Sequence, residues 1–139
     1  MNNRTCLRGV GVIEIIAATA IAAIFFTAMY ELLIFSLRTV DKGVRQVEAT
    51  YLSQEGVEAV RFMKNETWAT NIAPLVNGTT YYPVISGNEW TLSTTNPGPI
   101  NGVYTRTAIF EAVNRDASDD ISAVGTLDSD TRNLTVRVA

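Results

Sequence analysis

The residue with the most distinctive chemistry is Glu14, a lone carboxylate near the start of a long apolar stretch. Residues 9–30 read Gly-Val-Gly-Val-Ile-Glu-Ile-Ile-Ala-Ala-Thr-Ala-Ile-Ala-Ala-Ile-Phe-Phe-Thr-Ala-Met-Tyr and carry no other charge. A run of this length crosses the hydrocarbon core of a bilayer, which takes about 20 residues. A carboxylate placed there costs roughly 2.5–3.5 kcal/mol on insertion scales. Glu14 therefore requires either a positive partner or a place at the membrane border.

A second acidic group lies near the C-terminus, where a loop is expected between the last two strands. Carboxylate oxygens are ligands that calcium prefers, but the spacing here fits no EF-hand loop. Acidic loops are also commonly solvated turns. The sequence therefore predicts no cofactor, with calcium as the alternative. The calcium ligands in that case would be Asp116, Asp119, Asp120, Asp128 and Asp130.

Composition excludes most catalytic chemistry. The chain has no histidine and a single cysteine, Cys6, so a histidine-based triad, a His/Cys metal cluster and an intrachain disulfide are all excluded. Cys6 follows Asn-Asn-Arg-Thr and not the apolar segment that a lipoprotein anchor requires. The net charge of −3, without a clustered basic surface, argues against nucleic acid as a partner. We expect a protein that is not an enzyme.

The residues before the apolar stretch favour a cytoplasmic N-terminus. Residues 1–9 are short and polar, and Arg4 and Arg8 precede the apolar run. Positive residues at a membrane border bias that side inward. A secretory signal peptide has an apolar region of about 7–15 residues before a small-residue cleavage site. The run here is longer, so an anchor is predicted, although Ala18-Thr19-Ala20 keeps cleavage as an alternative.

A single long helix is predicted over residues 10–64. Residues 10–37 form its apolar half, which suits a membrane or the core of a filament. Beyond Arg38 the pattern becomes amphipathic, with apolar or small residues at helical spacing between charged helix formers. These residues are Val40, Val44, Val47, Tyr51, Leu52, Gly56, Ala59, Val60 and Met63.

The remaining residues, 65–139, predict a small head of about four antiparallel strands. Alternating β-branched and aromatic residues between turn signals mark these strands. The expected strands are Tyr81–Ile85, Glu89–Thr94, Gly102–Asn114 and Leu134–Val138, the first two joined by a tight turn at Ser86-Gly87-Asn88.

The sequence predicts roles for four side chains in the head. Trp68 and Trp90 are expected to anchor the core between helix and sheet. Arg106 and Arg137 are expected to pair with Glu89 or Glu111 on the solvent face, with anion binding as the alternative.

The fold class that follows is α+β. The apolar face of the sheet needs a cover, and the amphipathic half of the helix is the natural one. The apolar half, residues 10–37, would then protrude bare from the head. Only a membrane or other copies of the chain can bury such a surface.

The N-terminal residues resemble the class III leader of type IV pilins and of the pseudopilins of type II secretion and competence systems. A basic leader ends at Gly9, and Val10-Gly-Val-Ile-Glu14 opens an apolar helix in the same register as in that family. Tyr51–Arg61 also looks like a segment of minor pilin-like proteins. The resemblance implies a bacterial protein that is cut after Gly9 by prepilin peptidase and methylated on Val10.

The resemblance also implies a location and a set of partners. The chain would sit in membrane lipid as a single-pass inner-membrane protein with its head outside, and would then enter a pilus or pseudopilus. Its partners would be other pilin subunits and the inner-membrane assembly platform. Glu14 would set the assembly register by pairing with the terminal amine of a neighbouring copy. The alternatives are a solvated Glu14 at the membrane border, and a single-pass membrane protein whose β head binds a ligand without polymerising.

Overall fold

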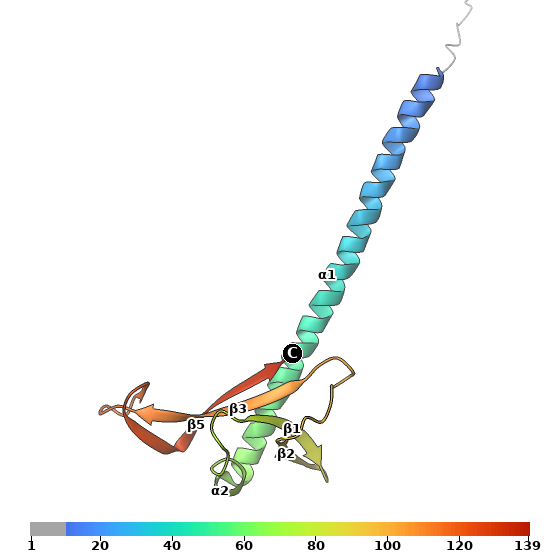
Figure 1. Cartoon of the computed structure of the whole chain (residues 1–139). Helices are drawn as coiled ribbons and strands as arrows, with labels where there is room; N and C mark the ends of the chain where they lie inside the picture. Colours follow the sequence, from blue (N-terminus) through green and yellow to red (C-terminus); the bar gives the residue numbers. More distant parts are fainter. Residues whose placement is uncertain (1–10) are drawn as a thin grey trace, which may run out of the picture. The chain divides into compact units, whose positions relative to one another are not determined.

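The computed structural model describes residues 11–139, which form a long helix, a short second helix and a five-stranded antiparallel sheet (Figure 1). This confirms the predicted α+β arrangement. The elements in chain order are α1 (Val12–Glu66), α2 (Trp68–Asn71), β1 (Thr80–Ser86), β2 (Glu89–Ser93), β3 (Arg106–Arg115), β4 (Ile121–Ser122) and β5 (Thr126–Val138).

The chain divides into two compact units, and the division falls within α1. One unit ends at Val44, and the other comprises Arg45–Ala139. The second unit contains the end of α1, α2 and all five strands. The head of the molecule is therefore built on the last part of the long helix.

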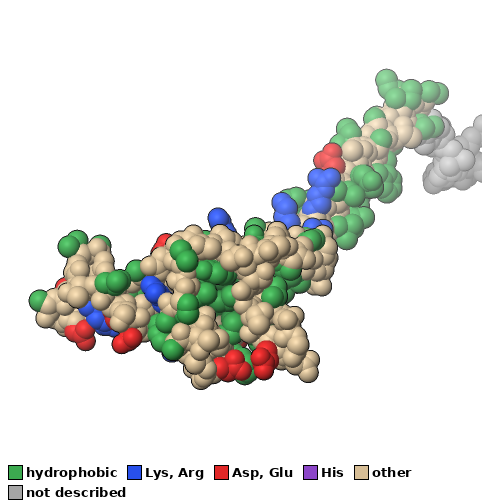
Figure 2. All heavy atoms as spheres, turned by 60° about the horizontal axis from the view of Figure 1, so that its bottom comes forward, with side chains coloured by type: hydrophobic (Ala, Val, Ile, Leu, Met, Phe, Trp, Pro, Cys, Tyr) green, Lys and Arg blue, Asp and Glu red, His purple; other side chains and the backbone are tan. Residues whose placement is uncertain are grey.

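Most side chains of α1 in the first unit are apolar and exposed; the charged ones are Glu14, Glu31, Arg38, Asp41 and Lys42. Figure 2 shows the apolar side chains along this part of the helix. Its three threonine hydroxyls are satisfied within the helix. The hydroxyls of Thr19, Thr27 and Thr39 donate to carbonyl oxygens one turn earlier, at 3.0, 2.9 and 2.9 Å. Because these bonds are local, the threonines leave no unsatisfied donor on an otherwise apolar rod.

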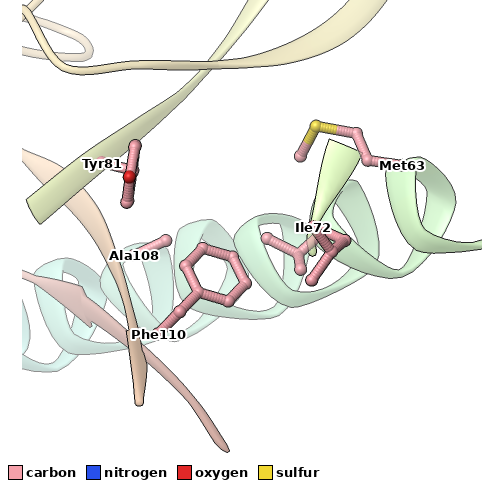
Figure 3. Close-up of a cluster of buried hydrophobic side chains, with 6 residues drawn as sticks. Met63, Ile72, Tyr81, Ala108 and Phe110 are labelled. Atoms are coloured by element: carbon pink, nitrogen blue, oxygen red, sulfur yellow. The ribbon is translucent and has the colours of Figure 1, made fainter. Parts of the chain in front are cut away.

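The core of the second unit lies where the end of α1 meets β1 and β3. Met63 of α1 and Ile72 after α2 pack with Tyr81, Ala108 and Phe110 of the sheet (Figure 3). The rings of Tyr81 and Phe110 meet edge to face, with centroids 6.0 Å apart. Such a pair stabilises a core by about 0.5–1.5 kcal/mol beyond area burial. Trp68 and Trp90 are partly buried against this cluster, which confirms the prediction for both.

One part of the predicted amphipathic stripe is wrong. Gly56, Ala59, Val60 and Met63 are buried, but Val40, Val44, Val47 and Tyr51 are exposed. Five residues separate Tyr51 from Gly56, which is about 140° around an α-helix. The apolar pattern therefore drifts to another face of the helix, and the sheet covers only the last turns. At Gly56 the approach is close, since a Cβ there would lie 2.8 Å from Arg106 Cδ and from Val136 Cγ1.

The first hairpin forms at the predicted turn. β1 and β2 pair from Tyr82 opposite Ser93 to Ser86 opposite Glu89. Gly87 and Asn88 connect them with φ values of 61° and 73°. Positive φ at both central residues matches a two-residue hairpin turn whose twist suits the flanking strands.

The end of the chain differs from the prediction. β5 has 13 residues and begins at Thr126, and the short strand β4 is additional. β5 pairs with β3 from Val138 opposite Arg106 to Thr126 opposite Arg115, with a bulge at Ala112/Val113. Asp128 and Asp130 therefore lie in a strand and not in a loop, because pairing resumes beyond the bulge.

Candidate functional site

The candidate site is the apolar part of α1 together with Glu14. Among residues 11–139, α1 is long and apolar enough to cross a membrane, and its most apolar window is not covered by any other part of the protein. Large apolar side chains point outward around the whole rod. They are Val12, Ile13, Ile15, Ile16, Ile21, Ile24, Phe25, Phe26, Met29, Tyr30, Leu32, Leu33, Phe35 and Leu37.

Glu14 lies at the start of this helix and bonds to its own chain. The backbone N–H of Gly11 donates to Glu14 Oε2 at 3.3 Å. α1 begins at Val12, so Glu14 reaches back to the residue before the helix, as in one half of a capping box. The positive end of the helix dipole also favours a carboxylate here. Within the described part of the chain, the other carboxylate oxygen of Glu14 makes no hydrogen bond.

The residues of the proposed leader and of its cleavage site lie outside the described residues. These are Arg4, Cys6, Arg8, Gly9 and Val10. Cleavage after Gly9 and methylation of Val10 therefore stay predictions.

The acidic residues of the head are engaged mainly with the protein itself. The Asp116 carboxylate accepts from the backbone N–H of Ser118 at 2.8 Å and of Asp120 at 3.1 Å, which closes the turn. Asp128 Oδ2 accepts from Arg115 Nε at 2.6 Å. Within residues 11–139, no group of three Asp, Glu, Cys or His side chains is arranged to hold a metal ion.

Local hydrogen bonds lower the pKa of Asp128 to about 2. The Thr131 hydroxyl contributes most, followed by the Arg115 guanidinium and the backbone N–H of Asp130. The same bond to Asp128 raises the pKa of Arg115 above its usual value. The carboxylate of Asp128 thus has a guanidinium as its partner, and a calcium ion at the acidic residues stays an untested alternative.

Arg106 does not take the predicted place on the solvent face. It is buried, and its NH1 bonds to Glu55 Oε2 at 2.8 Å, while NH2 bonds to the Pro83 carbonyl at 3.3 Å. The guanidinium also lies over the Trp90 ring, 5.2 Å from its centroid. Arg106 therefore fastens β3 to α1 and β1. Arg106 alternates along β3 with Ala108 and Phe110, which are buried on the same face. This alternation was the sequence feature that could have predicted the burial of Arg106.

A second link between sheet and helix was not predicted. The Tyr104 hydroxyl donates to Glu48 Oε2 at 3.0 Å, and the Asn101 amide donates to Glu48 Oε1 at 3.0 Å. Both bonds tie the segment before β3 to α1. From the sequence alone, Glu48 is expected to lie on the exposed face of the helix. No neighbouring residue therefore indicated that Tyr104 and Asn101 would bond to it.

Comparison with known proteins finds no match to any protein-family model, curated protein or solved structure. The pilin resemblance therefore depends on the leader motif, the apolar helix and the position of Glu14.

Proposed function

We propose that this chain is a pilin-like structural subunit of a type IV pilus or of a type II secretion or competence pseudopilus. Prepilin peptidase cuts it after Gly9, Val10 is methylated, and residues 10–37 then carry it into the filament core. The observation that carries the proposal is the bare apolar rod of α1 with a single acid near its start.

The surface chemistry of the rod supports burial in two successive environments. Large apolar side chains exposed on every side are unstable in water. A bilayer covers them first, with Arg4 and Arg8 on the cytoplasmic side. In a filament, the same rod packs among identical or related helices, which replace lipid as the apolar surroundings.

Glu14 gives this packing a fixed register. Cleavage after Gly9 creates a new amine at Val10, a positive charge beside the apolar segment. A buried carboxylate is tolerated when it is paired, so each Glu14 favours an axial offset that brings a neighbouring amine within reach. The bond from Gly11 N–H occupies only one carboxylate oxygen, which leaves the other for this contact.

The test is mass spectrometry of the chain recovered from the membrane and the sheared filament fractions of its host. The proposal expects a mature N-terminus at methylated Val10 in both fractions. A Gly9→Val variant, in which the cleavage site is blocked, should keep Met1 and stay in the membrane. Recovery of the unaltered chain with Met1 intact contradicts the proposal and supports a single-pass membrane protein that does not polymerise.

A further inference from the structure

The outer edge of β5 is free to pair with another strand. β5 pairs with β3 on one side, and no strand among residues 11–139 pairs with its other side. Thr105 and Ala139 exchange backbone hydrogen bonds of 2.8 and 3.0 Å. Because bonding residues alternate along an antiparallel pair, Leu134, Val136 and Val138 direct their N–H and C=O groups away from β3. Such an edge is a template for one more strand.

An apolar hollow lies beside this edge, between β5 and the helices. Its volume is about 200 Å³. Phe110 and Leu134 of the sheet, Val60 of α1 and Ile72 after α2 contribute apolar surface to it. The other lining residues are Val57, Arg61, Lys64, Trp68 and Arg132. A hollow of this kind is best filled by an aliphatic side chain.

The rim of the hollow is positive. It carries three cations and no carboxylate. Arg61 is paired with Glu58 at 2.6 Å, but the ammonium group of Lys64 has no hydrogen bond or ion pair within the described residues. Arg132 donates only to uncharged acceptors, the side chain of Asn77 at 2.9 Å and the carbonyl of Ala73 at 3.3 Å. A ligand that carries carboxylates beside an apolar residue complements this rim.

The same chain presents such a segment at the far end of β3 and β5. We call residues 119–124 the arm tip; they project with the ends of these strands (Figure 1). Asp119 and Asp120 precede β4, whose Ile121 is 69% exposed, and Val124 is 81% exposed. The Asp120 side chain has no ion pair within residues 11–139. β4 is the last strand in the order β2-β1-β3-β4 and pairs only with β3. Its other edge is therefore also free.

We infer that the arm tip of one copy docks on the β5 edge of the next copy. Ile121 enters the hollow, β4 lies along β5, and Asp120 faces Lys64 and Arg132, while Asp119 keeps its ion pair with Arg115 of its own chain at 3.6 Å. The interface joins two different surfaces, so it repeats from copy to copy along an open assembly. The inference rests on the proposed function, because a filament is what brings a second copy of the head alongside the first.

Disulfide cross-linking of the full chain in its host tests the contact. Val57→Cys in the hollow and Ile121→Cys in the arm tip are combined with Cys6→Ser, and filaments are oxidised before electrophoresis. The expected result is a ladder of dimers, trimers and larger species. Each single-cysteine variant should give no ladder. The matched control Val57→Cys with Val103→Cys should give none either, because Val103 is also exposed, at 54% against 69% for Ile121, but lies outside the arm tip.

Charge exchange provides a second readout on the same cross-link. Lys64→Glu and Asp120→Lys should each lower the cross-linked fraction by roughly two- to fivefold, the range of an exposed ion pair, and the double variant should restore it. If the cysteine pair disturbs folding, Lys64→Cys with Val124→Cys replaces it. Absence of a ladder with both pairs, dimers only, or capture of a different protein overturns the inference. With methylated Val10 present, that failure leaves the proposed function standing, whereas an intact Met1 removes both.

Discussion

Several charged side chains in this protein are held by partners that lie far away in sequence. Arg106 is a strand residue, yet its charge is met by Glu55 of α1 at 2.8 Å. Asp128 is held by Arg115 at 2.6 Å across the β3–β5 pair. Glu14 differs from both, because its bond from Gly11 is local and satisfies one oxygen only. Of Glu55, Asp128 and Glu14, the last therefore has the weakest support from the described residues.

Replacing Glu14 tests that contrast. We expect Glu14→Leu to insert normally into the membrane, since removing a charge makes the rod more apolar, and to lose most filament incorporation. Glu31→Leu is the matched control, because Glu31 lies on the same rod but away from the N-terminal amine. Quantifying the chain in membrane and sheared filament fractions gives the result. Normal filament incorporation of the Glu14 variant would show that the register role is wrong.

The ion pair of Asp128 with Arg115 predicts that residues 114–128, which we call the arm, loosen as the pH falls. Folding lowers the pKa of Asp128 from 3.8 to about 2, so its contribution to stability is present above pH 4 and is lost as the pH falls from about 4 to 2. Amide hydrogen exchange, corrected for its intrinsic pH dependence, should speed up in residues 114–128 over this range. The amide exchange of Phe110 in the core should not speed up over the same pH range. In Asp128→Asn the arm should exchange fast throughout, and a protected, pH-independent arm would contradict the assignment.

At the scale of elements, α1 carries different surfaces along its length. Its last turns use Gly56, Ala59 and Met63 to approach the sheet closely. Small residues at this contact let the helix backbone come near Arg106 and Val136. The neighbouring Val47 and Tyr51 stay exposed and add to the exposed apolar surface of the helix. The helix is thus a support for the head over one stretch and an unburied surface over the rest.

Two glycines of α1 separate these roles experimentally. Gly56→Ala should destabilise the head by about 1–2 kcal/mol, because the new Cβ overlaps a stiff valine and a buried arginine. Gly43→Ala meets no atom within 4 Å and should stabilise the helix by about 0.5–1 kcal/mol. Chemical denaturation followed by tryptophan fluorescence measures the first effect, and circular dichroism of the full chain in detergent measures the second. A neutral or stabilising Gly56 variant would show that the close approach is absent.

At the scale of the whole molecule, the buried core belongs to one unit. Every buried hydrophobic side chain in the described part of the chain lies between Ala59 and Val113. The unit Arg45–Ala139 therefore contains the complete core, whereas the exposed rod before it contributes none.

This distribution predicts how the two parts behave when separated. Residues 45–139 expressed alone should be a soluble, cooperatively folded monomer, because no core contact is removed. The full chain should require detergent or lipid. Sedimentation and thermal unfolding of the shorter chain measure this behaviour. An unfolded or insoluble 45–139 fragment would mean that the first part of α1 contributes to folding.

The sequence by itself determined the features that depend on local periodicity and turn chemistry. The long helix, its apolar first half, the β1–β2 hairpin with its turn at Gly87 and Asn88, and the alternation of β3 all follow from neighbours in the chain. The sequence also predicted that Glu14 lies near the start of the helix. Its function stays a proposal, because the partner that would reveal it belongs to another molecule.

Only the tertiary structure decided the features that depend on pairing between distant segments. Which helix face meets the sheet was set by the close approach at Gly56, although the apolar pattern pointed equally to Tyr51. The burial of Arg106 required Glu55 to lie opposite it. The length of β5 depended on pairing that resumes with β3 beyond a bulge. Such contacts join residues that share no local pattern, so their energies enter only once the chain has folded.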